Sequence, residues 1–453
     1  MQLVAYGAQD IYLTGNPQIT FFKVVYRRHT NFSMEEIAQT PSGLVDFGGE
    51  ADYTISRNGD LIHKMYFEYK PNSLIPTLLK GETQNVSGKL NSVSNFGNTL
   101  LKEVQCEIGG QIIDTHYSHW LNTWADLTEH NNTSTTDSIS KAHLGINIET
   151  YNNRQSDKHN LTLYQKMSGN IAATSIQSSL KVINQNNNSY LIPLRFWFNR
   201  NPGLSLPLIA LQYHEVKIKI TFEEVNNLLY GEAVTGAGPT WTEVSLSGDK
   251  TPQLRDGTLF VQYMYLDTDE RRRFAQVSHE YLIEQLQFQK ESSNKKTFLL
   301  NFNHPVKEII WGGSNVSFSN AESAEDGAKY NILRGSNLRC DKTTLRPSED
   351  TTWKITLNGH DRFTPRDSTY FTRQQIYDHH TGSGSVMDSD CIAVYSFALK
   401  PEEHQPSGTC NFSRIDTSEL ICSNNTTGNI NIYAINYNVL RIMSGMGGLA
   451  YSN

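Results

Sequence analysis

The sequence contains no apolar run as long as the roughly 18 residues that a membrane-spanning helix needs. Its first residues also lack the positively charged and then apolar layout of a secretory signal peptide. We therefore expect a soluble chain that is made in the cytosol, for which a membrane is at most a neighbour.

Catalytic and metal-binding motifs are absent as well. The five cysteines are odd in number, widely spaced and without Cys-x-x-Cys spacing, which argues against a disulfide framework or a zinc site. The chain has no P-loop, no nucleotide-type GxGxxG and no GxSxG elbow. We predict that the protein is not an enzyme and that it uses no cofactor or metal ion.

An excess of positive charge is also missing. The 39 Lys and Arg residues are outnumbered by 46 Asp and Glu residues, which gives a formal net charge of -7. Near the start of the chain, Arg27, Arg28 and His29 form a basic cluster that is too small to track a phosphate backbone. Direct binding of nucleic acid is therefore not expected.

What the chain does have is the composition of a folded β protein. Its 453 residues include 22 Tyr, 19 Phe and 31 Gly, which favour strands and turns over helices. The length exceeds that of one ordinary core, so we expect two large domains that are mostly β.

The start of the chain predicts an arm followed by a buried strand. Ile19–Tyr26 is almost continuously β-branched or aromatic, which is typical of a strand covered on both faces. Asn16 and Pro17 precede it and favour a turn, because proline cannot donate to a ladder. The chain is therefore expected to enter this strand from a peripheral arm.

Further strands are predicted from turn signals and alternation. Asn58-Gly59 and Gly109-Gly110 each separate two apolar segments and predict hairpins. Alternating apolar residues or β-rich runs predict other strands around 216–220, 297–302, 306–311, 353–357, 391–399 and 430–442.

Helices are few. From Tyr117 to Leu127 the apolar residues recur every three or four positions, which predicts a helix that covers the edge of a sheet, with Asp114 and Thr115 as caps. A second, short helix is predicted where an N-cap pattern at Asp267 precedes three arginines.

Polar stretches divide the chain. The segment 131–189 and the Gly-, Thr- and Pro-containing segment 231–257 read as long loops. The resulting prediction is an arm at 1–18, a first domain at 19–225, a connecting segment at 226–257 and a second domain at 258–453.

The two halves also show a weak internal echo. The sequence NGDLIHKMYF at 58–67 resembles NHPVKEIIW at 303–311, and CEIGGQIIDTHYSHW at 106–120 resembles ITLNGHDRFTPRDSTYF at 355–371. Because both matches occur in the same order and at nearly equal offset, we predict one β-domain used twice.

Two residue patterns that resemble chemical sites have simpler explanations. His116 and His119 lack the HExxH spacing and an evident third ligand, so polar residues on the solvated face with Asp126 are the preferred interpretation. Ser138 and Lys141 match SxxK of acyl enzymes without the partner motifs, which indicates chance.

Asn-x-Ser/Thr sequons are numerous, although an Asn-, Ser- and Thr-rich chain without a signal peptide generates them by composition. They give candidate glycosylation sites at Asn85, Asn131, Asn132, Asn160, Asn187, Asn315, Asn411 and Asn424, and further sequons lie at Asn31 and Asn425.

Long blocks of the chain resemble one protein family. The major capsid proteins of nucleocytoplasmic large DNA viruses, above all the phycodnavirus and mimivirus-like branch, are similar in order from about residue 3 onward. The blocks are YGAQDIYLTGNPQITFFKVVYRRHTNF, ISRNGDLI, RFWFNRNPGLSLPLIALQYHEVKI, LDTDERRRFAQVSHEYLIEQ, LNGHDRF and YSFALKPEEHQPSGTCNFSRID.

The resemblance implies an all-β double jelly roll, with two eight-stranded antiparallel sandwiches in tandem, a few short helices and long loops. It further implies a homotrimer with a pseudo-hexagonal outline that contacts neighbouring capsomers, minor capsid proteins and vertex proteins. Such capsomers tile an icosahedral shell over an internal membrane, into which they do not insert, and around a DNA genome.

The resemblance also places the chain in the virion capsid, after synthesis and assembly in the host cytoplasm. Family members are often glycosylated. In this family the amino-terminal arm would lie at the base of the trimer as an assembly contact, and the residues assigned to that role are Tyr6, Asp10, Tyr12, Asn16 and Pro17.

Two alternatives remain open at this point. Jelly rolls also occur in carbohydrate-binding proteins, since a fold does not determine a function. A minor capsid or vertex protein is the other alternative, and it would form pentamers or act transiently.

Overall fold

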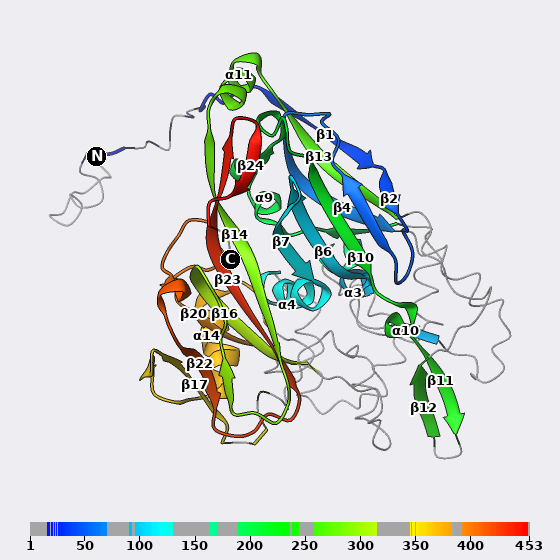
Figure 1. Cartoon of the computed structure of the whole chain (residues 1–453), viewed down its shortest axis with the longest axis vertical. Coiled ribbons are helices and arrows are strands. Elements are labelled where there is room, and N and C mark those ends of the chain that lie inside the picture. The colour runs from blue at the N-terminus through cyan, green and yellow to red at the C-terminus, as the bar shows by residue number, and fades with distance from the viewer. Residues whose placement is uncertain are drawn as a thin grey trace, which may run out of the picture.

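The computed structural model describes residues 16–18, 20, 22, 24, 26–69, 90–92, 96–129, 163–169, 189–235, 238–243, 257–314, 345, 347–348, 350–382, 384 and 392–451. These residues form two β-sandwiches with short helices around them (Figure 1). No helix in the described ranges is both long and apolar enough to cross a membrane.

The first sandwich consists of two antiparallel sheets. One sheet has the strand order β1-β13-β4-β8, with β9 also paired to β4, and the other has the order β2-β3-β10-β6-β7. The strands are β1 (Phe32–Gln39), β2 (Pro41–Gly43), β3 (Glu50–Thr54), β4 (Leu61–Tyr69), β6 (Leu101–Ile108), β7 (Gln111–Tyr117), β8 (Tyr190–Pro193), β9 (Leu206–Pro207), β10 (Val216–Phe222) and β13 (Thr258–Leu266).

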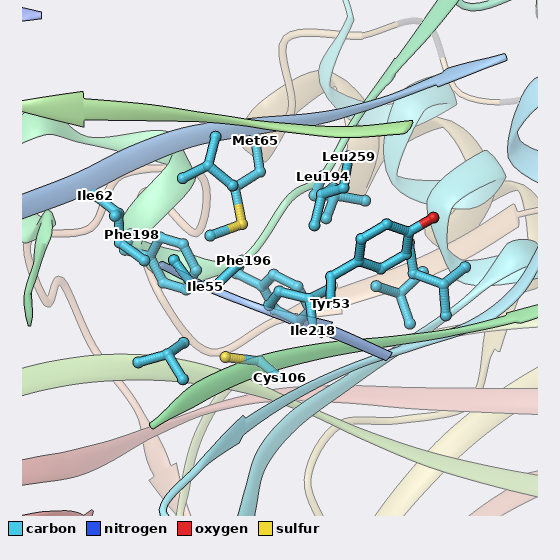
Figure 2. Close-up of a cluster of buried hydrophobic side chains, with 14 of the residues drawn as sticks. Tyr53, Ile55, Ile62, Met65, Cys106, Leu194, Phe196, Phe198, Ile218 and Leu259 are labelled. Atoms are coloured by element: carbon cyan, nitrogen blue, oxygen red, sulfur yellow. The ribbon is translucent and has the colours of Figure 1, made fainter. Parts of the chain in front are cut away.

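The core of this sandwich lies between its two sheets. Figure 2 shows Met65 and Leu259 of one sheet facing Cys106 and Ile218 of the other, and all four are buried. Strand β10 buries every second residue, which confirms the alternation seen at 216–220. Each large apolar side chain buried in this way contributes about 1.5 to 3 kcal/mol relative to exposure.

The second sandwich has the sheet orders β14-β23-β16-β20 and β15-β22-β17-β18. Strand β21 also pairs with β16, β19 with β17, and β24 with β23. The strands are β14 (His279–Glu291), β15 (Thr297–Leu299), β16 (Pro305–Ser314), β17 (Thr352–Leu357), β18 (His360–Asp361), β19 (Arg366–Asp367), β20 (Ile392–Ser396), β21 (Cys410–Asn411), β22 (Ser418–Cys422), β23 (Asn429–Met443) and β24 (Met446–Leu449).

The two sandwiches repeat one topology. In the first, the edge strand β1 pairs with β13, which pairs with β4 on its other side. In the second, the edge strand β14 pairs in the same way with β23, which pairs with β16 on its other side. The echoed sequence segments fall on equivalent strands, β4 with β16 and the hairpin β6-β7 with β17-β18. The predicted all-β double jelly roll is therefore confirmed.

The second pair of similar segments, 106–120 and 355–371, shares a tight turn whose backbone lies in the left-handed region. Gly109 and Gly110 have φ of 59° and 84°, and Asn358 and Gly359 have φ of 51° and 77°. Two consecutive positive φ values suit a two-residue hairpin turn, which strongly favours Asn and Gly.

The hairpin prediction at Asn58-Gly59 was wrong. Strands β3 and β4, which flank it, lie in opposite sheets, and neither residue has a positive φ. Gly59 instead lies against Tyr263, where a Cβ would come within 2.8 Å of the tyrosine Cβ. The lack of a side chain at Gly59 therefore lets the chain pass close to Tyr263 where it crosses from one sheet to the other.

The predicted domain boundary at 258 was also wrong. Strand β13 pairs with β1 and β4, so it closes the first sandwich and does not open the second. The passage between the sandwiches comes after Leu266, at helix α11 (Thr268–Gln276). The polar composition of the segment before residue 258 suggested the boundary but carried no information about the partners of the strand that follows it.

The predicted strand at Ile19–Tyr26 is not found among the described residues of that segment. Thr20, Phe22, Val24 and Tyr26 lie outside any strand, and the first strand is β1. Phe22 is 99% exposed and Tyr26 87% exposed, so the described part of the chain leaves both side chains uncovered. A high β propensity produces a strand only where a partner edge is available.

Both predicted helices are confirmed, as α4 (Ser118–Thr128) and α11, and Asp267 accepts a hydrogen bond from the Thr268 backbone as the N-cap of α11. Asp114 and Thr115 do not cap α4, because they lie in β7. The remaining elements are α3 (Phe96–Leu100), α7 (Leu163–Ser168), α9 (Trp197–Arg200), α10 (Val225–Leu228), α14 (Gln375–His379), β5 (Leu90–Ser92), β11 (Leu229–Thr235), β12 (Gly238–Glu243), the short turns η3 (Pro202–Leu204), η4 (Leu208–Ala210) and η6 (Phe412–Arg414), and the π-helical turn η5 (Tyr370–Gln374).

Candidate functional site

Helix α4 joins the two sandwiches. Its residues Trp120, Trp124 and Leu127 are buried in one cluster with side chains from strands of the second sandwich. These partners are Ile310, Ile392, Val394, Tyr433 and Ile435. The apolar stripe that predicted a sheet-covering helix therefore covers a sheet of the other sandwich, which fixes the two sandwiches against each other.

The carboxyl end of α4 is closed by the second sandwich. The Gly382 N–H donates to the Leu127 carbonyl at 2.7 Å, and the Gly384 N–H donates to the Asp126 carbonyl at 3.0 Å. The last carbonyls of a helix have no hydrogen-bond donor within the helix. The loop after α14 supplies the donors for these two carbonyls. A Cβ on Gly382 would lie 2.4 Å from the Leu127 carbonyl carbon, so only glycine fits at this contact.

A buried ion cluster lies at the same junction. Glu284 of β14 pairs with Lys307 of β16 at 2.9 Å and with Arg200 of α9, in the first sandwich, at 2.7 Å. Burial alone would raise the pKa of Glu284, but the charges of Lys307 and Arg200 and a bond from His404 lower it to about 2. The Arg200 guanidinium also stacks 4.8 Å from the Trp124 ring, which connects this cluster to α4.

A second buried cluster centres on His380. Its Nε2 lies 3.1 Å from Glu308 Oε2 and its Nδ1 lies 3.1 Å from Glu402 Oε1. Burial opposes the charged imidazole, but the charge of Glu308 and the bonds to both carboxylates raise the pKa of His380 to about 9. Its ring also forms a T-shaped contact with the Trp124 ring, so the imidazolium lies beside the joining helix.

Sequence reasoning missed these charged residues. Lys307 and Glu308 are consecutive charges inside the apolar run of β16, and both side chains are fully buried. Such a pair within a buried strand is a signal, because buried charges require partners. The partners themselves come from distant segments of the chain, so the sequence could not have identified them.

The hairpin of β23 and β24 forms a third connection. The Tyr213 N–H donates to the Gly445 carbonyl at 2.9 Å, and His214 bonds to the Gly447 carbonyl, also at 2.9 Å. Gly447 approaches Leu211 so closely that a Cβ would meet its side chain at 2.6 Å. The end of the second sandwich is thus bound to the first.

The matches to known families divide at the passage between the sandwiches. The family described as major capsid protein N-terminus matches residues 20–267, and the family described as large eukaryotic DNA virus major capsid protein matches residues 270–448. The chain belongs to the family of major capsid proteins of large eukaryotic DNA viruses.

Relatives match this capsid protein over its whole length. The major capsid protein of Pyramimonas orientalis virus is 45% identical over 478 residues, covering 100% of this chain and 99% of the relative. That of Paramecium bursaria Chlorella virus 1 is 39% identical over 497 residues, with the same coverage. A chain of the quasi-atomic PBCV-1 virus capsid has a TM-score of 0.66 and 34% identity, over 96% of this chain and 100% of that chain.

The arm residues predicted for this capsid protein are placed only in part. Asn16 and Pro17 are exposed, and Asn16 has a φ of 52°, which agrees with the predicted turn. Tyr6, Asp10 and Tyr12 lie outside the described residues. The role of all five as an assembly contact stays a prediction.

The candidate glycosylation sites are likewise placed in part. Asn411 is exposed, and Asn424 is partly buried with its amide nitrogen donating to Ser348 Oγ at 2.8 Å. The other candidate sites lie outside the described residues, and they are Asn85, Asn131, Asn132, Asn160, Asn187 and Asn315.

The prediction that His116 and His119 lie on a solvated face is wrong. His116 is buried, with its Nε2 3.0 Å from Asp114 Oδ2, and His119 packs among aromatic rings and bonds to Tyr433 Oη. Burial and the charge of Lys290 lower the pKa of His119 to about 3, so its ring is neutral. Among the described residues, no group of three or more His, Cys, Asp and Glu side chains could hold a metal ion.

Proposed function

We propose that three copies of this chain form the structural capsomer of an icosahedral virion. The observation that carries this proposal is the repetition of one sheet order in two sandwiches that are joined rigidly by α4 and the buried ion clusters. Three such chains around a three-fold axis present six similar lobes, which is an outline suited to hexagonal packing. The proposed role is structural, because it depends on the shape of the chain and on contacts between copies. We propose no enzymatic activity.

Around this capsomer we propose the following surroundings. Neighbouring capsomers, minor capsid proteins and vertex proteins are the contacts at its sides and base, and an internal membrane lies beneath it without being entered. Direct contact with nucleic acid is not part of the proposal, because the chain is net acidic, with a formal charge of -7. Assembly is placed in the cytoplasm of the host.

The domain organisation follows the strand pairing in this proposal. The arm precedes β1, the first jelly roll ends with β13, and the second begins after α11. We assign the arm residues Tyr6, Asp10, Tyr12, Asn16 and Pro17 to contacts between capsomers or with underlying proteins. Glycans, where present, are assigned to the candidate sequons.

Mass measurement of the purified protein tests the capsomer. A trimer has a mass of about 154 kDa, which is three times the 51.2 kDa of one chain. A stable monomer would contradict the proposal, and a pentamer would instead support a vertex protein. A specific and saturable signal on a glycan array would favour the carbohydrate-binding alternative.

Deletion of residues 1–16 tests the arm separately. Both sandwiches should remain folded, because every described strand begins at or after Phe32. Contacts between capsomers should weaken, which is measured as a loss of particle assembly. Normal assembly by the shortened chain would refute the role of the arm.

A further inference from the structure

The loop that follows α14 supplies the groups that close the carboxyl end of α4. We call its residues 380–382 and 384 the α14 loop. Thr381 Oγ1 donates to the Thr128 carbonyl at 3.1 Å, and the N–H groups of Gly382 and Gly384 donate to the two carbonyls before it. Because α4 joins the two sandwiches, the position of this loop affects the joint between them.

The α14 loop is fixed through its first residue, His380. The imidazole bridges two carboxylates from other elements, with Nε2 3.1 Å from Glu308 of β16 and Nδ1 3.1 Å from Glu402 in the loop after β20. Glu402 also accepts hydrogen bonds from the Thr381 N–H and from Thr381 Oγ1, each at 2.9 Å. One charged imidazole therefore connects the α14 loop to the second sandwich.

The Glu308 carboxylate depends on this imidazole. Its side chain is fully buried, and it accepts no hydrogen bond from any other described residue. A buried charge that loses its partner is strongly destabilising, because water cannot reach it. Loss of the imidazole proton therefore favours a movement that admits water to Glu308.

Charged groups on the neighbouring elements do not replace this pairing. Helix α4 presents an aromatic ring to the imidazole, and Arg200 and Lys307 are both paired with Glu284. On α14 itself, the side chains of Asp378 and His379 bond to other groups. The protonation of the imidazole is therefore set by the two carboxylates that it bridges.

We propose that His380 is a pH-sensitive switch, which fastens the α14 loop to α4 while its imidazole is charged and releases the loop when the proton is lost. The charged imidazole satisfies both carboxylates, so the loop stays closed over the end of α4. Without the proton, the loop opens in preference to β16, because β16 is paired with a strand on each side.

The direction of the pH dependence follows from the surroundings of the imidazole. Burial disfavours its charged form, but Glu308 and Glu402 raise the pKa of His380 from 6.5 to about 9. In the open loop the imidazole is in water and has its ordinary pKa. The open fraction therefore rises about tenfold for each pH unit between pH 6.5 and pH 9, and it is constant below and above this range.

Hydrogen–deuterium exchange of the full-length protein tests the switch. The backbone N–H groups of the α14 loop all donate hydrogen bonds when the loop is closed. After correction for the intrinsic exchange rate at each pH, their protection factors should fall at least tenfold from pH 6 to pH 8.5. The amides of β10, in the first sandwich, should keep theirs. Unchanged protection of the α14 loop would overturn the switch, and an equal fall in β10 would show unfolding in its place.

Three variants assign the effect to the buried pair. His380→Gln should lose the pH dependence and give low protection already at pH 6, whereas His379→Gln, at the adjacent position, should keep the wild-type profile. Glu308→Gln removes the buried charge, so the loop should stay protected at pH 8.5. A wild-type profile in His380→Gln, or unprotected amides at pH 8.5 in Glu308→Gln, would contradict the proposal.

If His380→Gln does not fold, the profiles of the wild type and of Glu308→Gln decide the question. The switch belongs to a single chain, so its failure would leave the proposed capsomer standing.

Discussion

His380 and Glu308, whose side chains are both fully buried, form an ion pair of 3.1 Å beside the helix that joins the two sandwiches. The pKa of His380 is raised from 6.5 to about 9. The stabilisation from this pair is therefore complete below pH 6.5 and is lost as the pH rises through 9, by about 3 kcal/mol in total.

Chemical unfolding between pH 6 and pH 10 measures this loss. In the variant His380→Gln the pH-dependent step should disappear, and stability at pH 7 should fall by about 3 to 5 kcal/mol because Glu308 stays buried without its partner. The double variant His380→Gln/Glu308→Gln should recover part of that loss. The control His360→Gln removes an exposed histidine and should keep the wild-type profile, and a wild-type profile in His380→Gln would contradict the prediction.

Replacement of Trp124 by alanine should weaken the connection between the sandwiches. The side chain is 3% exposed, packs in the cluster between α4 and the second sandwich, and carries the Arg200 guanidinium on its face. The expected loss is about 3 to 5 kcal/mol from lost burial and the cavity left behind. Urea unfolding measures it, and Tyr377→Ala, which truncates an exposed aromatic, should change stability by less than about 0.5 kcal/mol. Equal midpoints for the two variants would show that the tryptophan does not join the sandwiches.

Gly382→Ala should disturb the end of α4. The new Cβ collides with the Leu127 backbone and disrupts the 2.7 Å hydrogen bond to it, which should cost about 1 to 3 kcal/mol. Gly203→Ala is the matched control, because its nearest obstacle is the Asn201 side-chain oxygen at 3.3 Å. Thermal unfolding of both variants is the measurement, and similar melting temperatures would refute the expected collision.

Among the described sequons, Asn411 should accept a glycan more readily than Asn424. The Asn411 side chain accepts from Ser413 N–H through its oxygen, whereas the Asn424 amide nitrogen is already a donor to Ser348. Because a glycan is attached to that nitrogen, the bond at Asn424 must be lost first. Glycopeptide mass spectrometry of protein expressed through a secretory pathway should show higher occupancy at Asn411. Ser413→Ala and Thr426→Ala remove the two sequons as controls, and higher occupancy at Asn424 would reverse the ranking.

Local patterns predicted most of the strands and both helices correctly, because period and turn chemistry act over a few residues. The same turn signal succeeded at Gly109-Gly110 and failed at Asn58-Gly59. In the first case the two strands are partners, and in the second the chain crosses from one sheet to the other. A turn signal marks a reversal of the chain, but the partner of each strand is decided by packing over long distances.

The candidate site was less predictable than the fold. The apolar stripe from Trp120 to Leu127 predicted a helix that covers a sheet. The sequence did not indicate that this sheet belongs to the other sandwich. His380 and Glu308 are 72 positions apart and fit no spacing rule, so only the folded chain brings them together. The exposure of Phe22 and Tyr26 was also unpredictable, since their composition is that of a buried strand.

The pairing of β1 with β13 and of β14 with β23 has a consequence for synthesis on the ribosome. Strand β1 can pair only once β13 has been made, more than 200 residues later, and β14 likewise can pair only once β23 has been made. A nascent chain can therefore close the first sandwich while the second is still being made. A chain that stops before β23 leaves β14 and β16 without their common partner. The strand order therefore makes the second sandwich depend on a finished chain.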